Sequence, residues 1–156
     1  MKTICIYCTR TGITKKIAED IAAAVGAELS EITDGKARRG VFGFIGGAVV
    51  GLRKKLPELL PLRTERPLEE YDRVIVLAPV WCETLSPIAR AFLTEEKSSL
   101  KGELDLVITH MSDLTYEEPV RKFTDSVGLA PKHFLSVKTK NHVFSDEVKG
   151  FIEELK

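Results

Sequence analysis

Residues 3–14 read TICIYCTRTGIT and join an apolar run to a turn rich in hydroxyl groups. The run at residues 3–8 is dominated by β-branched, aromatic and small apolar side chains, which predicts a buried strand. Apolar residues then recur at helical spacing as far as Gly26, so we expect a helix to begin near Gly12. A strand that passes directly into a helix is typical of an α/β protein.

The remainder of the chain repeats this alternation of strand and helix. Further candidate strands lie at residues 27–32, 73–79, 104–110 and 133–139, of which the first is the weakest. Candidate helices contain residues 88–93, 120–127 and 145–156, the last capped by Ser145 or Asp146. Five strands with helix-length connections predict a parallel sheet covered on both faces. No linker divides the sequence, so residues 1–156 are expected to form one domain.

The composition excludes several classes of protein. With 44% hydrophobic and 29% charged residues, the chain has the composition of a globular protein. Its 23 basic and 23 acidic residues balance, whereas nucleic-acid binding proteins normally carry a basic excess. Because the N-terminal residues lack the pattern of a secretory signal, we expect a cytoplasmic protein. Cys5, Cys8 and Cys82 cannot all pair with one another, and no structural disulfide is expected.

The turn after the first strand has the features of an anion site. The start of the following helix supplies unpaired amides and roughly half a positive charge from the helix dipole. Hydroxyl groups of Thr9, Thr11 and Thr14 can donate hydrogen bonds, and Gly12 permits a close backbone approach. Arg10 and Lys15 add mobile positive charge. The sequence therefore predicts a phosphate-bearing ligand here.

The residues of this turn do not match other phosphate-binding motifs. The glycine spacing of neither the Walker loop nor the dinucleotide fingerprint is present. A phosphatase loop with Cys8 as nucleophile would need an arginine where Thr14 stands. A helix start that is merely capped by threonines, with no ligand, stays open.

Two segments of the chain resemble segments of a known family. The segment TRTGIT at residues 9–14 resembles the T-x-T-G-x-T phosphate loop of the flavodoxin family. The segment APVWCETLSP at residues 78–87 is similar to the P-V-W-x-G-x-x-S-P segment that follows the third strand in flavodoxin-like proteins. The resemblance implies a three-layer αβα sandwich, a five-stranded parallel sheet of order 2-1-3-4-5, and flavin mononucleotide (FMN) as cofactor.

In that strand order, the carboxyl ends of the first, third and fourth strands surround the topological switch point, where such sheets bind ligands. The implied cofactor-binding residues are Thr9, Arg10, Thr11, Gly12, Ile13, Thr14, Pro79, Val80, Trp81, Cys82, Glu83, Thr84, His110, Met111 and Tyr116. Trp81 is expected to contact the flavin ring, although an indole packed under its own loop is the alternative. Met111 and Tyr116 would cover the other face, unless Tyr116 simply starts the next helix. His110 would donate to the pyrimidine oxygens or relay protons.

Two departures from the family pattern bear on the chemistry. Glu83 stands where relatives commonly have glycine, and the loop after residue 110 lacks the glycine-rich sequence of the reductase branch. If the Glu83 carboxylate faces the ring, it would disfavour the anionic reduced flavin and lower the reduction potential, so Glu83→Gln would raise that potential.

An apolar segment at residues 40–52 lies between basic residues and is too short to span a bilayer. Its glycines Gly43, Gly47 and Gly51 fall four apart and would line one face of a helix. Three interpretations stay open: a crossover helix packed on the sheet, a surface for a partner or anionic lipid, and a homodimer interface.

These expectations lead to one function and two alternatives. The first is an FMN-containing electron-transfer protein with a redox partner protein or a small-molecule acceptor. The second is an FMN-dependent NAD(P)H:quinone or nitro-compound reductase. The third is a flavin-free interaction module with the same fold. We assign no catalytic residue, no metal ligand and no membrane span.

Overall fold

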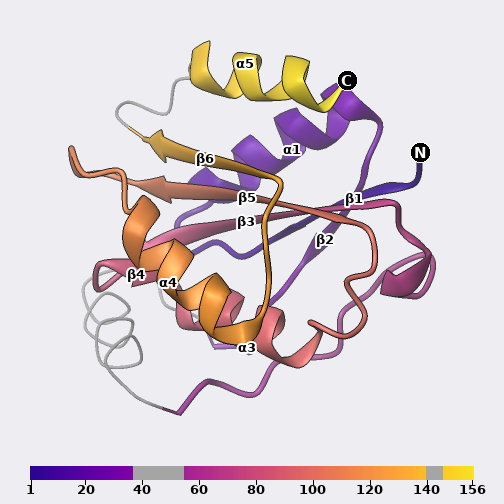
Figure 1. Ribbon diagram of the computed structural model, residues 1–156, viewed down its shortest axis with the longest axis horizontal. Coiled ribbons are helices and arrows are strands. Elements are labelled where there is room, and N and C mark those ends of the chain that lie inside the picture. The colour runs from indigo at the N-terminus through magenta and orange to yellow at the C-terminus, as the bar shows by residue number, and fades with distance from the viewer. Residues whose placement is uncertain (37–54, 140–145) are drawn as a thin grey trace.

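The computed structural model describes residues 1–36, 55–139 and 146–156. Its centre is a sheet of parallel strands in the order β2-β1-β3-β5-β6 (Figure 1). These strands are β1 (Thr3–Tyr7), β2 (Glu28–Glu31), β3 (Arg73–Trp81), β5 (Glu103–His110) and β6 (His133–Lys138). The predicted parallel sheet is confirmed, and its order equals 2-1-3-4-5 when the parallel strands are counted along the chain.

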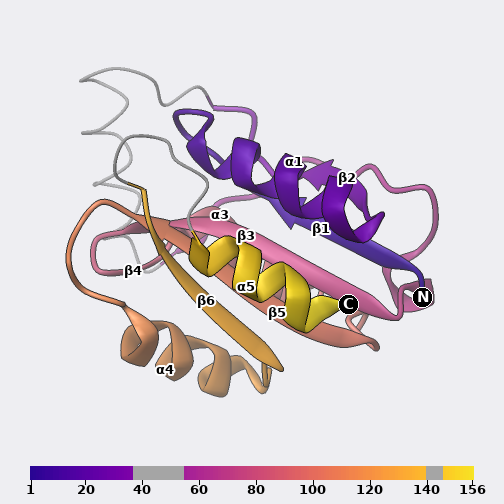
Figure 2. The ribbon, with the colours of Figure 1, turned by 90° about the horizontal axis from the view of Figure 1, so that it is seen from above.

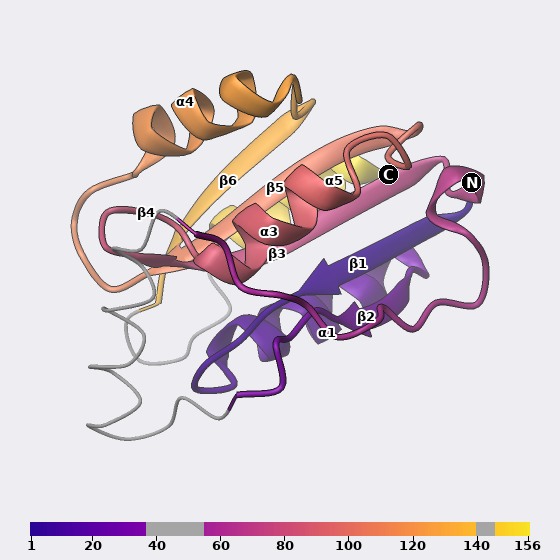
Figure 3. The same cartoon turned by 90° about the horizontal axis from the view of Figure 1, so that it is seen from below.

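Helices cover both faces of the sheet. Helices α1 (Ile13–Val25) and α5 (Asp146–Leu155) lie on one face, as Figure 2 shows from above. Helices α3 (Pro87–Glu95) and α4 (Glu117–Val127) lie on the other face, as Figure 3 shows from below. A short 3-10 helix, η1 (Leu68–Glu70), precedes β3. The predicted three-layer αβα arrangement is therefore confirmed.

The core consists of two apolar layers because neighbouring residues of a strand point to opposite faces. In β1, Ile4 and Ile6 pack under α3 and α4, whereas Cys5 and Tyr7 pack under α1 and α5. The middle of β3 is buried on both faces, since Val74 to Ala78 are at most 1% exposed. This double burial explains the nearly unbroken apolar run in that part of the sequence.

One hairpin was not predicted. β3 continues two residues beyond Pro79, and β4 (Thr84–Leu85) folds back on it in antiparallel pairing. The connecting residues Cys82 and Glu83 both have left-handed backbones, with φ of 50° and 64°. Two-residue hairpin turns are usually predicted from an Asn-Gly or Asp-Gly pair, and residues 82–83 of this chain are neither.

Other boundaries differ slightly or fall outside the described residues. β2 is two residues shorter than expected, and α5 begins at Asp146. The predicted cap Ser145 and the glycines Gly43, Gly47 and Gly51 lie outside the described residues, so the predictions for them stay predictions. Within residues 1–36, 55–139 and 146–156, no helix has both the length and the apolar character to cross a bilayer.

Candidate functional site

The start of α1 has the backbone geometry of an anion site. Gly12 occupies the position before the helix with φ 90° and ψ −7°, a left-handed conformation that favours glycine. Because glycine has no side chain, α1 has no hydroxyl or carboxylate cap at that position. The first turn of α1 also contains no acidic residue. The positive end of the helix dipole is therefore available to an anion.

The three threonines of the turn have different roles. The Thr9 hydroxyl oxygen accepts a hydrogen bond from the Gly12 amide at 3.0 Å, which closes the turn on itself. The Thr11 side chain is exposed. Thr14 is 3% exposed, and its Oγ1 lies 2.8 Å from Oγ1 of Thr109 at the end of β5. Thr14 thus fastens α1 to the sheet, while Thr11 stays accessible to a ligand.

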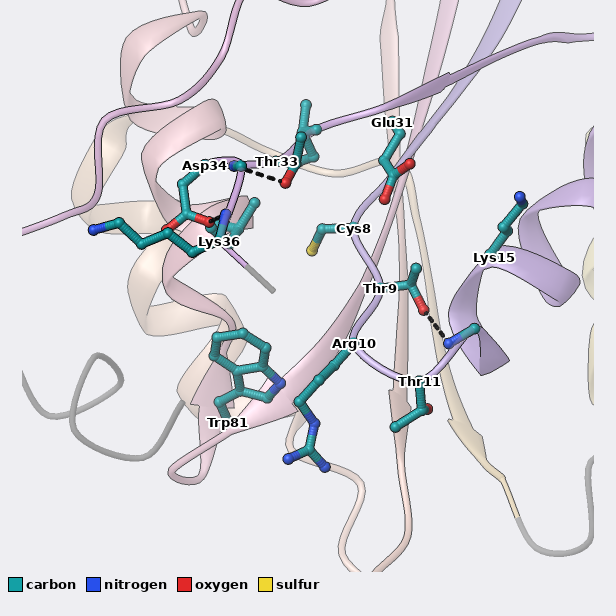
Figure 4. Close-up of a pocket in the computed structure, with 14 residues that line it drawn as sticks. Cys8, Thr9, Arg10, Thr11, Lys15, Glu31, Thr33, Asp34, Lys36 and Trp81 are labelled. Atoms are coloured by element: carbon teal, nitrogen blue, oxygen red, sulfur yellow. Dashed lines mark hydrogen bonds between the residues drawn. The ribbon is translucent and has the colours of Figure 1, made fainter. Parts of the chain in front are cut away.

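A cavity of about 500 Å³ opens beside this turn (Figure 4). Its volume falls in the range of small-molecule sites, about 300–1,000 Å³. Its lining comes from the β1–α1 turn, the end of β2, the end of β3 and the start of α3. The lining residues are Cys8, Thr9, Arg10, Thr11, Gly12, Lys15, Glu31, Ile32, Thr33, Asp34, Gly35, Lys36, Trp81 and Ile88.

The floor of the cavity is apolar and contains a neutral thiol. Cys8, Ile32 and Ile88 are each at most 4% exposed. The Cys8 Sγ lies 3.2 Å from Oγ of Ser86, the residue that caps α3. Burial raises the pKa of Cys8 to about 12, and the contact with Ser86 opposes this increase only in part. A thiol that stays protonated cannot act as a phosphatase nucleophile, in agreement with the interpretation of the sequence.

Several residues of the β3–β4 hairpin were predicted to bind the cofactor. Of these, Trp81 lines the cavity. Its half-buried indole lies on the same side of the cavity as Arg10 in Figure 4. Pro79, Val80 and Thr84 are also half-buried but do not line it.

Cys82 and Glu83 form the exposed tip of this hairpin. The Glu83 side chain is exposed and is not among the cavity-lining residues. The effect on reduction potential hypothesised from the sequence requires an inward-facing carboxylate, and this arrangement does not supply one.

The loop after β5 forms its own hydrogen-bond network. His110 Nε2 lies 2.8 Å from Ser136 Oγ, and its Nδ1 lies 3.2 Å from the Ser112 carbonyl oxygen. The Ser112 hydroxyl donates to the Tyr116 hydroxyl at 2.8 Å, and the Tyr116 ring meets the His110 ring edge-on at 5.1 Å. Both imidazole nitrogens therefore have partners within the protein. Burial lowers the pKa of His110 from its ordinary value.

This loop does not contribute to the cavity beside the turn. His110, Met111 and Tyr116 are absent from its lining, and Met111 is 75% exposed. Tyr116 stands at the position before α4 with φ 56°, which is the helix-start position given as the alternative for this residue. Ile13, the first residue of α1, is half-buried and also lies outside the lining.

The sequence interpretation missed the wall that the end of β2 contributes. Glu31, Thr33, Asp34 and Lys36 line the cavity on the side of β2. Glu31 ends β2 and the other three residues follow it, and this strand is short and weakly marked in the sequence. The expected strand order contained a usable signal, since β2 neighbours β1 and parallel strands end at the same edge of a sheet.

Comparison with known proteins places this geometry in a recognised fold. No protein-family model matches the chain, and no curated protein sequence does. Among solved structures, a flavoprotein from Lactobacillus acidophilus NCFM in complex with FMN is similar, with TM-score 0.68, 22% identity, and coverage of 86% of this chain and 91% of that one.

Two further structures cover nearly the whole chain. A candidate flavoprotein from Bacteroides eggerthii DSM 20697 has TM-score 0.77 and 18% identity, covering 98% of this chain and 96% of that one. A flavodoxin, WrbA-like protein from Agrobacterium tumefaciens has TM-score 0.55 and 14% identity, covering 97% and 90% respectively. At these identities the likeness shows the fold, which is flavodoxin-like.

Proposed function

We propose that this flavodoxin-like chain binds FMN and acts in electron transfer. The observation that carries the proposal is the cavity that joins the uncapped start of α1 to the indole of Trp81. A phosphate group suits the first end, because helix amides and the helix dipole stabilise an anion. A flat aromatic ring suits the second end, because an indole offers a large apolar surface. The similar fold of a flavoprotein in complex with FMN adds support.

Each part of the site would have its own task. The amides of the first turn of α1 and the Thr11 hydroxyl would donate hydrogen bonds to the phosphate, and Arg10 and Lys15 would add positive charge. Trp81 would cover the ring and exclude water from one of its faces. The bound flavin supplies the redox chemistry, since it accepts and releases electrons. The protein supplies binding, orientation and a local field.

The phosphate contact is tested by comparing FMN with riboflavin, which lacks the phosphate. We expect the purified protein to quench FMN fluorescence on binding and to bind riboflavin roughly 100-fold more weakly, since two charge-assisted hydrogen bonds contribute about 3 kcal/mol or more. Lys15→Ala should weaken FMN binding roughly 10-fold and leave riboflavin binding unchanged. Failure of the protein to bind added FMN would refute the proposal.

Lys16→Ala is the matched control for that experiment. Lys16 lies on the same turn of α1 but does not line the cavity, and it pairs with Asp20 at 3.5 Å. The Lys16→Ala variant loses the same charge at nearly the same place as Lys15→Ala, but outside the cavity. Its affinity for FMN should therefore equal that of the wild type. An equal loss in both variants would show a general effect of charge rather than a phosphate contact.

Electron transfer is distinguished from the two alternatives by separate measurements. FMN uptake excludes the flavin-free interaction module. Steady-state oxidation of NADH or NADPH by the FMN-loaded protein, with a quinone as acceptor, would favour the reductase. Absence of turnover, together with reversible reduction of the bound flavin by dithionite, is the outcome expected for an electron carrier.

A further inference from the structure

A buried pair of hydroxyl groups joins the start of α1 to the end of β5. Thr14, the second residue of α1, is 3% exposed, and Thr109 of β5 is 4% exposed. Their Oγ1 atoms lie 2.8 Å apart, which is a normal distance for a hydrogen bond between two hydroxyl groups. Because the pair is buried, removal of one hydroxyl would take away the partner of the other in a place that water does not easily reach.

Thr109 is a fixed point of the sheet. Its backbone lies between two neighbouring strands, where it pairs with Pro79 of β3 and Val137 of β6. Alternate residues of a strand face the same side of a sheet, and Val107, two residues earlier, packs in the layer under α1 and α5. A hydroxyl that enters this layer needs a partner to offset its loss of water. Thr14 supplies that partner, so the end of β5 holds the start of α1.

The contact acts on a residue whose backbone amide belongs to the anion site. Helical hydrogen bonding of α1 starts with the Lys16 amide, which donates to the Gly12 carbonyl oxygen at 3.1 Å. The amides of residues 13–15 come before it, and these are the groups that a helix start offers to an anion. Thr14 lies in the middle of this set. Any displacement of Thr14 therefore also displaces the amides beside it.

The other end of the turn is held on the opposite face of the sheet. The Cys8 amide donates to the Leu77 carbonyl oxygen at 3.0 Å, and Cys8 Sγ lies 3.2 Å from Ser86 Oγ at the start of α3. Cys8 packs in the layer under α3 and α4. Residues 9–13 thus connect two points that are fixed in different layers of the core. The shape of the turn is set by these contacts within the protein.

We infer that Thr109 is a positioning residue that holds the start of α1 in the geometry that binds the phosphate group. The inference rests on the proposed FMN binding and deepens it. Thr109 does not line the cavity and acts through Thr14. It also lies outside both flavodoxin-like segments, residues 9–14 and 78–87. Hydrogen bonds weaken as their distance and angle depart from the optimum, so a small shift of α1 weakens the contacts that its amides make.

The first test measures FMN and riboflavin binding by the wild type, Thr109→Val and Thr109→Ser. Valine keeps the shape of threonine without its hydroxyl, and serine keeps the hydroxyl. We expect Thr109→Val to weaken FMN binding roughly 5-fold, the effect of about one hydrogen bond, and to leave riboflavin binding unchanged. Thr109→Ser should retain the wild-type ratio of the two affinities.

Thr124→Val is the matched control. Thr124 is 1% exposed, does not line the cavity, and donates to the Arg121 carbonyl oxygen within α4 at 3.0 Å. The substitution therefore removes a buried threonine hydroxyl that has no contact with α1. Its ratio of FMN to riboflavin affinity should equal that of the wild type. If Thr109→Val does not fold, Thr109→Ala, which also lacks the hydroxyl, takes its place in both tests.

The second test needs no flavin. Hydrogen exchange of the Lys16 amide reports on the first turn of α1, and that of the Ala27 amide, which donates to the Ala22 carbonyl oxygen at 2.9 Å, reports on the other end. We expect Thr109→Val to accelerate exchange of the Lys16 amide roughly 5-fold and to leave the Ala27 amide as in the wild type. A general loss of stability would instead accelerate both amides equally.

The outcomes separate this inference from the proposed function. An unchanged ratio of FMN to riboflavin affinity in Thr109→Val, or an equal change in Thr124→Val, would overturn the inference while leaving FMN binding intact. Equal acceleration of exchange at both ends of α1 would overturn it as well. Wild-type protein that does not bind FMN would overturn the proposed function together with the role of Thr109 in phosphate binding.

Discussion

His110 shows how a single residue can be placed correctly and still differ in role from its expectation. It lies at the carboxyl end of β5, where a ligand contact was expected. Its two ring nitrogens, however, lie within hydrogen-bond distance of Ser112 and Ser136. The Ser136 Oγ also lies 2.6 Å from the Thr115 carbonyl oxygen. These contacts make His110 a residue that holds the β5–α4 loop against β6.

The pH dependence of stability tests this role. Burial holds the pKa of folded His110 below its ordinary value of 6.5. As the pH falls through 6.5, the unfolded chain takes up the proton first, so the free energy of unfolding should fall until the pH passes the lower folded pKa. Above pH 7 the residue is neutral in both states and contributes no slope. His110→Gln should remove this part of the pH dependence in urea unfolding between pH 5 and 8, and parallel curves for the two proteins would contradict the assignment.

At the scale of elements, the β3–β4 hairpin is the feature that carries Trp81 to the cavity. Antiparallel pairing of Trp81 with Thr84 fixes the indole at the end of β3. The cost is a turn in which two side-chain-bearing residues, Cys82 and Glu83, adopt positive φ. Glycine avoids that cost, which gives a physical reason for the glycine that the flavodoxin-like pattern has at the position of Glu83.

Replacement of Glu83 by glycine should therefore stabilise the protein. The left-handed backbone penalty of about 1–2 kcal/mol disappears, and the greater freedom of glycine in the unfolded chain offsets part of the gain. We expect the free energy of unfolding to rise by up to about 1 kcal/mol. Because Glu83 does not line the cavity, FMN affinity should be unchanged. Glu83→Ala, which removes the carboxylate but keeps the backbone penalty, is the control, and an equal gain in Glu83→Ala would refute the backbone explanation.

At the scale of the whole molecule, a buried ionic network stabilises the sheet at the amino ends of its strands, away from the candidate site. Arg73, 6% exposed, donates to the Leu155 carbonyl oxygen of α5 at 2.6 Å and to Glu103 at 2.6 Å. Its Nε forms an ion pair with Oδ2 of the fully buried Asp105 at 3.3 Å, without hydrogen-bond geometry. Oδ1 of Asp105 lies 2.8 Å from His133 Nδ1. The network thus joins β3, β5, β6 and α5.

Removal of the Asp105 carboxylate leaves the charge of the buried Arg73 guanidinium with less compensation. Asp105→Ala should lower the free energy of unfolding by about 3–5 kcal/mol. Lys132→Ala, which breaks only the half-exposed pair with Glu103, should lower the free energy of unfolding far less than Asp105→Ala does, because solvent screens that pair. Urea unfolding measures both values. The network lies at the amino ends of the strands and the cavity at their carboxyl ends. Folded Asp105→Asn protein should therefore retain its affinity for FMN. A large loss of affinity would contradict the independence of the two ends.

The sequence by itself determined the parallel sheet and the position of the turn after the first strand, whereas the order of the strands followed from the resemblance of residues 9–14 and 78–87 to flavodoxin-like segments. These features are local or nearly so. The apolar run before Thr9 and the helical spacing after Gly12 each depend on residues close together in the chain. The alternation of strands and helices then restricts the sheet to very few arrangements. Trp81 could be proposed because it follows the predicted strand at residues 73–79, whose carboxyl end must lie beside that of β1.

The tertiary structure alone decided which of these residues share a cavity. Thr14 turns inward because Thr109, 95 residues away, supplies its partner, and the floor depends on Cys8 meeting Ser86 across 78 residues. Glu31 lines the cavity because strand register sets it beside Tyr7, and no local pattern in a short, weak strand reveals that register. Contacts of this kind follow from how the packed elements align, and that alignment is set by the burial of the whole core and by no single segment.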